Sequence, residues 1–110
     1  MTRYLISFDD GAMTFPDEDL PAVADAAHAV VREATEAGVW VFGGGLHSKE
    51  GVSVVATDGM VTDGPEGKAY IGGFSVVDVP SRDEALMWAA KLAFACRCAQ
   101  EVREFVPDSG

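Results

Sequence analysis

The sequence predicts an α+β fold in which an antiparallel sheet is covered on one face by two helices. Two stretches carry apolar residues at the three- and four-residue spacing of amphipathic helices. Several shorter stretches alternate, or are apolar throughout, as strands do. The expected order is strand, helix, strand, small hairpin, strand, helix, strand. Without the hairpin this is the ferredoxin-like plan, and one domain over residues 1–110 is expected from the length.

The first strand and the first helix are expected over residues 3–8 and 18–37. Alternation along the strand places three large side chains on one face. These are Tyr4, Ile6 and Phe8. The helix has one apolar stripe that begins at Leu20 and repeats at spacings of three and four. Gly38 then follows as the residue that ends the helix.

The middle of the chain predicts a central strand, a glycine turn and a hairpin. Residues 39–42 are apolar on both faces, as a buried central strand is. The three glycines at 43–45 would let the backbone turn sharply. Residues 58–59, Asp-Gly, are the two-residue signal of a type I′ turn. That turn would join a strand at 52–57 to a return strand at 60–62.

The last part of the chain predicts a strand at 72–79, a helix at 82–94 and a strand at 101–106. Ser81 and Glu84 form the capping box that starts the helix. The core stripe of this helix is expected to consist of Ala85, Leu86, Ala89, Leu92 and Ala93. The opposite face carries Met87, Lys91 and Phe94. Met87 and Phe94 there indicate either a subunit contact or a helix that ends sooner.

Composition and charge exclude several classes of partner. The formal net charge of −10 repels phosphate backbones and anionic lipid surfaces, so we expect neither nucleic acid nor a membrane as partner. No stretch approaches the roughly 20 apolar residues that span a bilayer. Cys96 and Cys98 lack the spacing of a zinc site or a disulfide framework. We therefore expect free thiols, no bound metal and a cytoplasmic location.

The sequence lacks the common motifs of cofactor chemistry. There is no P-loop, no GxGxxG, no nucleophile elbow and no HExxH. The Gly-Gly-Gly-Leu stretch at 43–46 follows a predicted strand, but no helix clearly follows it. We therefore expect no cofactor, and phosphate binding is not indicated.

Proton transfer near neutral pH would require a histidine within reach of a carboxylate. His28 lies at the edge of the first helix's buried face, where it either borders a pocket or is half exposed. His47 is interpreted more simply as a solvated loop residue. Asp63 is the stronger carboxylate candidate, and it either caps the following turn as an Asx-turn or acts in catalysis. Asp9 and Asp10 are alternatives.

Ligand-binding residues are less clearly indicated. Arg103 on the last strand is a candidate to hold an anionic ligand, although a surface salt bridge is the favoured interpretation. The aromatic residues Trp40, Phe42 and Trp88 are interpreted as core or pocket wall. The set of candidates for substrate binding is Arg103, Lys68, Trp40, Gly72 and Gly73.

Six short motifs along almost the whole chain resemble one known family. They are Ala-Gly-Val at 37–39, Gly-Gly-Gly-Leu at 43–46, Val-Thr-Asp-Gly-Pro at 61–65, Gly-Gly-Phe at 72–74, Asp-Glu-Ala-Leu-Met-Trp-Ala at 83–89 and Glu-Val-Arg at 101–103. Each is weak alone, but their order and spacing are fairly specific. With them the sequence resembles the YCII-related family, in particular its branch named after a DGPF motif.

The resemblance implies a ferredoxin-like fold and a homodimer whose two sheets face each other as an α/β barrel. It also implies a pocket between sheet and helices or near the subunit junction. Members of the branch are often associated with alternative sigma factors, which implies a regulatory setting. Related proteins in the wider superfamily resemble small enzymes that use a His–Asp pair, for which His28 and Asp63 are the candidates here.

The sequence departs from the family pattern after Asp-Gly-Pro. Glu66 stands where the branch has an aromatic residue, and the segment up to the Gly-Gly pair is shortened, with Lys68 left of the usual Lys-Glu pair. We therefore expect a dimeric small-molecule-binding or regulatory module. The alternative is a cofactor-independent enzyme of lyase or isomerase type, and the sequence leaves open whether the protein is an enzyme.

Overall fold

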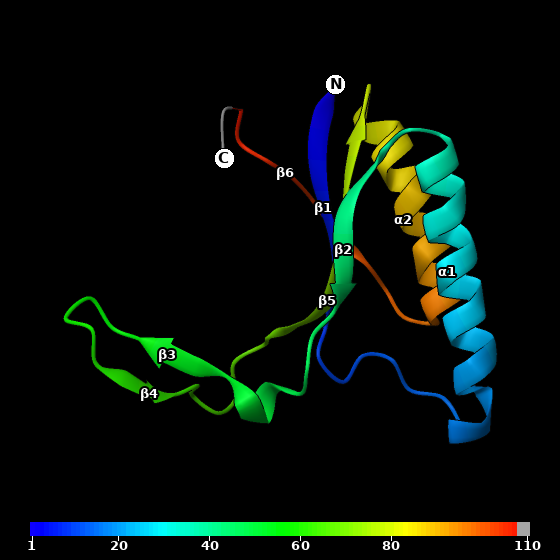
Figure 1. The fold of residues 1–110 in the computed structure, drawn as a ribbon. Coiled ribbons are helices and arrows are strands. Elements are labelled where there is room, and N and C mark those ends of the chain that lie inside the picture. Colours follow the sequence, from blue (N-terminus) through cyan, green and yellow to red (C-terminus); the bar gives the residue numbers. More distant parts are fainter. Residues whose placement is uncertain (108–110) are drawn as a thin grey trace.

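A computed structural model describes residues 1–107 and confirms the expected α+β architecture. A four-stranded antiparallel sheet is covered on one face by two helices (Figure 1). The strands are β1 (Thr2–Asp9), β2 (Trp40–Gly45), β5 (Ile71–Val79) and β6 (Glu101–Glu104). The helices are α1 (Leu20–Glu36) and α2 (Arg82–Cys96). The strand order β2-β5-β1-β6 is that of the ferredoxin-like fold.

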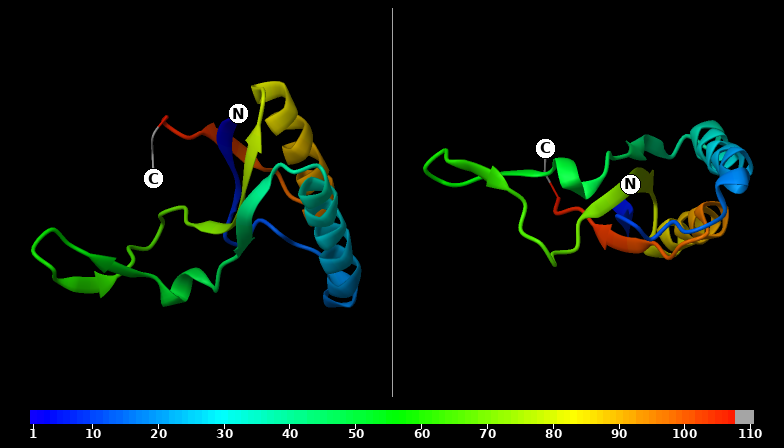
Figure 2. Two further views of the ribbon diagram at one scale, coloured as in Figure 1. Left: turned by 45° about the horizontal axis from the view of Figure 1, so that its top comes forward. Right: turned by 90° about the horizontal axis from the view of Figure 1, so that it is seen from below.

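A second, two-stranded sheet projects from this body. It consists of β3 (Ser53–Val55) and β4 (Val61–Asp63) and is preceded by a short 3₁₀ helix, η2 (Lys49–Gly51). Figures 1 and 2 show that the chain leaves the end of β2, runs out on the side of the sheet away from the helices, and returns to the start of β5. We call residues 49–70 the arm, and the face of the large sheet away from the helices the open face.

The hydrophobic core lies between the large sheet and the helices. The strands contribute Tyr4, Ile6, Val77 and Val79, all buried. The helices contribute Ala34, Ala85, Trp88, Ala89 and Leu92. The strand register explains which strand residues are buried beneath the helices. Tyr4 lies opposite Val77 and Ile6 opposite Ser75, on the same face of neighbouring strands. The predicted alternation of the first strand is thereby confirmed.

Strand β2 is an edge strand, and the prediction of a central strand is wrong. Its exposed side chains include Val41 and Phe42, the latter 63% exposed. The three glycines at 43–45 do not form a turn but continue β2, opposite residues 73–75 of β5. The pattern misled because the open face is itself apolar: the Phe42 ring packs against Phe74 there, with centroids 5.7 Å apart.

The turn between β3 and β4 is not the predicted type I′ turn. That type requires positive φ at both central residues, but Gly59 has φ 86° while Asp58 has a negative φ. The Gly59 N–H donates to the Ala56 carbonyl at 2.9 Å, and the Met60 N–H donates to the Asp58 carboxylate at 2.9 Å. This is a three-residue connection ending on a left-handed glycine. Strand β3 is shorter than predicted, and β4 has the predicted length but begins one residue later.

The helix ends follow the predicted signals. A 3₁₀ turn, η1 (Asp17–Asp19), precedes α1, and Pro21 occupies its first turn, where no N–H is needed. Gly38 follows α1 with φ 76°, the left-handed conformation expected there. Helix α2 begins with the Glu84 N–H donating to the Ser81 hydroxyl at 3.2 Å, as the capping signal predicts.

The buried faces of the helices differ from the predicted stripes at two leucines. Leu20 is 57% exposed and Leu86 is 40% exposed, so neither belongs to the core. In α2 the buried face includes Trp88, which the predicted stripe left out, and it does not include Leu86. Phe94 is 89% exposed and Met87 is also exposed, which confirms that they lie on the outward face.

Tyr4 joins β1 to β6, and this contact predicts a loss of stability in alkaline solution. The buried Tyr4 hydroxyl donates to the Glu104 carboxylate at 3.3 Å. Burial, and secondly the Glu104 charge, raises the pKa of Tyr4 above its ordinary value of 10.0. The contribution to stability is fully present below that value and is lost as pH rises through the higher pKa of the folded state.

We therefore expect the free energy of unfolding to fall above about pH 10. Tyr4 ionises readily in the unfolded chain at that pH, whereas burial disfavours its ionised form in the folded state. Urea unfolding at a series of pH values measures this. Tyr4→Phe removes the titrating group and should flatten the dependence. An identical decline in Tyr4→Phe would assign the effect to another group.

Candidate functional site

A cavity of about 460 Å³ lies at the base of the arm. Helix η2 forms one wall, and the Asp-Gly-Pro loop between β4 and β5 forms another. The lining residues are Lys49, Glu50, Val52, Asp63, Gly64, Pro65, Glu66, Gly67, Lys68 and Tyr70. The segment in which the sequence departs from the family pattern, at 66–68, is thus part of a cavity wall.

The Asp-Gly-Pro loop is held in place by Tyr70. The Tyr70 hydroxyl donates to the Pro65 carbonyl at 3.0 Å, and the Gly64 N–H donates to the Val52 carbonyl at 3.1 Å. A Cβ at Gly64 would lie 2.6 Å from the Tyr70 hydroxyl oxygen, so a larger residue here would require the Tyr70 side chain to shift. The Lys68 ammonium lies 5.4 Å from the centroid of the Tyr70 ring. These contacts pre-form the cavity wall.

The lining of this cavity carries charges of both signs. The ammonium groups belong to Lys49 and Lys68, and the carboxylates to Glu50, Asp63 and Glu66. All of these residues are exposed, so solvent screens each charge and no single ion pair with a ligand would be strong. Such a lining can hydrogen-bond a polar molecule that carries both donor and acceptor groups. It suits neither a purely apolar ligand nor a multiply charged anion.

A second cavity, of about 420 Å³, adjoins the first. The residues common to both are Lys49, Val52, Lys68 and Tyr70. His47 is an exposed loop residue, as the sequence indicated, and it also lines the second cavity. Because the three glycines continue β2 instead of turning, His47 follows the strand directly into the base of the arm. If the three glycines had been interpreted as part of the strand, the position of His47 just after the strand end would have indicated its place at the base of the arm.

Asp10 anchors the base of the arm to the end of β1. Its carboxylate accepts from the Lys49 N–H at 3.2 Å, and its own N–H donates to the Tyr70 carbonyl at 2.8 Å. Both partners belong to the arm and line the two cavities. Asp10 therefore has a structural role that positions the site, and it is not one of the residues that line either cavity.

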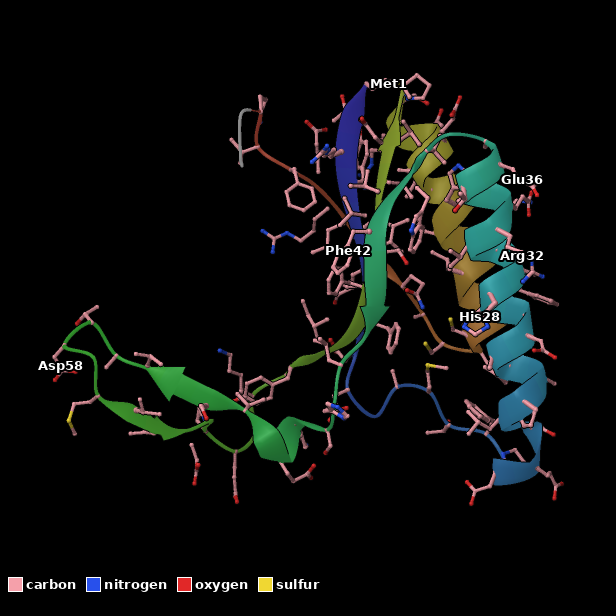
Figure 3. All side chains as sticks on the ribbon, viewed as in Figure 1. Met1, His28, Arg32, Glu36, Phe42 and Asp58 are labelled. Atoms are coloured by element: carbon pink, nitrogen blue, oxygen red, sulfur yellow. The ribbon has the colours of Figure 1, made fainter. Side chains whose placement is uncertain are left out.

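The structure does not bring His28 and Asp63 together within one protomer. His28 is exposed on α1, in the helical layer, whereas Asp63 ends β4 on the arm, on the other side of the large sheet (Figure 3). The Asp63 carboxylate forms no hydrogen bond within residues 1–107, so the predicted Asx-turn at this position is wrong. Asp58, in the turn between β3 and β4, makes such a contact, since its carboxylate accepts from the Met60 N–H.

Of the predicted ligand-binding residues, Lys68 lines the cavity at the arm and the others lie elsewhere. Arg103 lies on the open face in β6, opposite Leu5, and lines a separate cavity of about 290 Å³. Trp40 packs against the hydrophobic core from the helix side of β2. Its interpretation as core is confirmed, as it is for the buried Trp88.

The Gly72-Gly73 pair is a packing feature of β5. A Cβ at Gly72 would lie 2.8 Å from the Asp10 Cα, and a Cβ at Gly73 would lie 2.5 Å from the Phe8 Cζ. Both glycines are buried. They let β5 pass close to the end of β1 and so hold the arm's return against the body.

No group of three or more His, Cys, Asp or Glu side chains within 1–107 is arranged to hold a metal ion. Cys96 and Cys98 are free thiols. In the same part of the chain, neither helix is long and apolar enough to cross a bilayer.

Fold and site together define a ferredoxin-like α+β domain with a cavity formed by an Asp-Gly-Pro loop. The model of the YCII-related domain matches residues 4–107. The chain therefore belongs to the YCII-related family.

One solved structure similar to this chain is that of 5-chloro-2-hydroxyhydroquinone dehydrochlorinase from Burkholderia phenoliruptrix AC1100, in complex with 2,5-dihydroxybenzoquinone. The TM-score is 0.47 at 17% identity, and the match covers 94% of this chain and 93% of that one. No activity follows from a similarity of this size. None of the curated proteins compared with the chain matches it.

Proposed function

We propose that the protein is a homodimeric module that binds a polar small molecule in the cavity at the base of the arm. The observation that carries this proposal is the pre-formed loop wall, in which Tyr70 holds the Pro65 carbonyl at 3.0 Å. The cavity volume of about 460 Å³ falls in the range of small-molecule sites. The ammonium groups of Lys49 and Lys68 would pair with ligand oxygens, and the Asp63 carboxylate with a ligand hydroxyl or amine.

The open face supports the homodimer. Its apolar centre consists of Leu5, Phe42, Phe74 and Val76. Its charged residues are Arg3, Asp9, Asp78, Glu101 and Arg103. Two positive and three negative side chains leave this face nearly balanced in a chain of net charge −10, so two copies can approach there with little repulsion. An apolar face of this kind gains most from contact with its own copy.

We also place the chain in the DGPF branch of the family, on the Asp-Gly-Pro loop at 63–65. We propose further that residues 1–110 act as one domain and that the protein works in the cytoplasm. The free thiols of Cys96 and Cys98 support a reducing compartment.

The dimer is tested by a charge on the open face. Phe42→Asp should give a monomer in analytical ultracentrifugation, because it places a carboxylate at the centre of the proposed contact. Phe42 is 63% exposed, so the protomer itself should remain folded. Phe94→Asp, on the helical face, is the matched control and should remain dimeric. A wild-type chain that is monomeric at micromolar concentration would refute the dimer.

Ligand binding is tested by a thermal-shift screen of small hydroxy acids and amino acids, followed by calorimetry. Lys68→Met and Tyr70→Phe should each weaken binding about tenfold, because one removes a charged donor and the other releases the loop wall. Arg103→Met lies outside the cavity and should bind normally. A ligand that binds Lys68→Met and Asp63→Asn as tightly as the wild type would place its site elsewhere.

A second candidate function, a cofactor-independent lyase or isomerase, is favoured by the position of His47 in the adjoining cavity. The histidine of a His–Asp pair would then be His47, with Asp63 as its carboxylate, in place of His28. Substrate turnover should disappear in His47→Gln and Asp63→Asn and persist in His28→Gln. The reverse result for the two histidines would exclude this pair.

A further inference from the structure

We propose that the two protomers exchange arms, each β3–β4 hairpin docking in a groove at the far end of the partner's open face. This inference rests on the homodimer proposed above. It specifies a second contact between the protomers, outside the apolar centre of the open face, and the relative orientation of the two copies.

The hairpin lacks a packing surface of its own. An isolated two-stranded hairpin is marginally stable at best in water. Every residue of β3 and β4 is nevertheless exposed. The large apolar side chains on it are Val54, Val55, Met60 and Val61. Val55 and Met60 are 65% and 64% exposed, and such a cluster at the end of a projecting arm indicates contact with another chain.

The surface that fits this hairpin lies where β1 begins and β6 ends. Two cavities, of about 300 and 290 Å³, lie side by side there. The residues common to both are Glu104, Phe105 and Val106. Leu5 and Met1 extend the apolar lining, and Arg3 and Arg103 contribute one guanidinium to each cavity. We call these two adjoining cavities the groove.

The hairpin is acidic, whereas the groove carries charges of both signs, with Arg3 and Arg103 beside Asp78 and Glu104. Residues 52–64 contain two aspartates, Asp58 and Asp63, and no lysine or arginine. Asp58 lies in the turn at the tip, and one of its oxygens accepts from the Met60 N–H. In the groove, neither Arg3 nor Arg103 forms an ion pair within residues 1–107. A guanidinium of the partner can therefore pair with the tip carboxylate as the valines and Met60 bury apolar area.

The shape of the protomer decides between two possible orientations of the dimer. The arm leaves the end of the sheet where β2 ends and β5 begins, and it projects on the open side (Figures 1 and 2). The groove lies at the opposite end, where Thr2 pairs with Val79. The principal extents of the molecule are 43 × 42 × 18 Å. The body and the projecting arm together form an L (Figure 1).

A two-fold axis between the open faces and perpendicular to the strands would reverse one sheet relative to the other. Each arm would then meet the groove end of the partner, and the two L shapes would interlock. An axis parallel to the strands would instead bring the two arms together and leave both grooves empty. The first orientation brings the hairpin of one protomer to the groove of the other, and we assign it to the dimer.

The test uses the full chain with two charges on the hairpin. Val55→Asp combined with Met60→Asp should raise the dimer dissociation constant at least about tenfold in analytical ultracentrifugation. Both side chains lie outside the core, so the far-UV circular dichroism spectrum should not change. An unchanged dissociation constant, with Phe42→Asp monomeric, would overturn arm exchange and leave the open-face dimer standing. A monomeric wild type would overturn both.

A mixed crosslinking experiment identifies the groove. One preparation carries Thr57→Cys and the other Phe105→Cys, both with Cys98→Ser so that the half-buried thiol does not interfere. After mixing and mild oxidation, the expected product is a disulfide between the two preparations, because only an arm and a groove from different chains meet. Crosslinking of Thr57→Cys with itself would mean that the arms meet at the axis, and the groove assignment would be wrong.

Discussion

Replacing Trp88 with alanine will lower the free energy of unfolding by about 3–5 kcal/mol, the range for deleting a buried large aromatic side chain. Trp88 is 5% exposed and lies at the centre of the contact between α2 and the sheet. Because a small domain has only about 5–15 kcal/mol of total stability, this variant will be close to unfolded. Trp88→Phe, which keeps part of the ring, should remain folded and lose less.

Urea unfolding followed by far-UV circular dichroism measures both variants. The matched control is Phe94→Ala on the same helix, because Phe94 is 89% exposed. Its effect should stay within about 0.5 kcal/mol. Equal losses for Trp88→Ala and Phe94→Ala would contradict the assignment of the inward face of α2.

Replacing Gly43 with alanine should cost about 1–3 kcal/mol or more, because the strand ladder leaves no room for a methyl group. A Cβ at this position would lie 2.5 Å from the Phe74 carbonyl oxygen and 2.8 Å from the Trp40 ring. The first of these atoms is backbone of β5 and cannot move without disturbing the β2–β5 pairing. Thermal and urea unfolding should both report the loss.

The neighbouring glycine provides a matched control for Gly43. A Cβ at Gly44 would have no neighbouring atom within 4 Å. Gly44→Ala should therefore be neutral or slightly stabilising, since alanine restricts the unfolded chain more than glycine does. If Gly44→Ala were as destabilising as Gly43→Ala, loss of flexibility rather than steric conflict would explain both. The three glycines would then act as a hinge within β2.

The secondary structure elements and their order were predictable because their signals are local. Because β1 and α1 are each buried on one side, apolar residues recur about every 2 positions in β1 and about every 3.6 positions in α1. Both spacings are visible directly in the sequence. The Ser81 cap and the glycine after α1 likewise act within a few residues. The motifs that resemble the YCII-related family identified that family from the sequence, and the match over residues 4–107 confirms it.

The candidate site was predicted only in part. Asp63 and Lys68 were expected in a loop and do line one cavity. The pairing of Asp63 with His28 was not realised in the protomer, because the partners lie on an arm and a helix separated by the sheet (Figure 3). A hairpin's direction of projection depends on how its base is anchored, here by Asp10, and no local pattern records that.

The sequence by itself determined which residues form helices and strands and the family to which they belong, because those properties depend on neighbours a few positions away. Only the tertiary structure decided that β2 lies at an edge, that the open face is apolar, and that the arm projects from it. A strand that is apolar on both faces has the same sequence pattern whether its second face is covered by the same chain or by a second protomer. Contacts between distant segments settle the difference, and they are formed only when the chain folds.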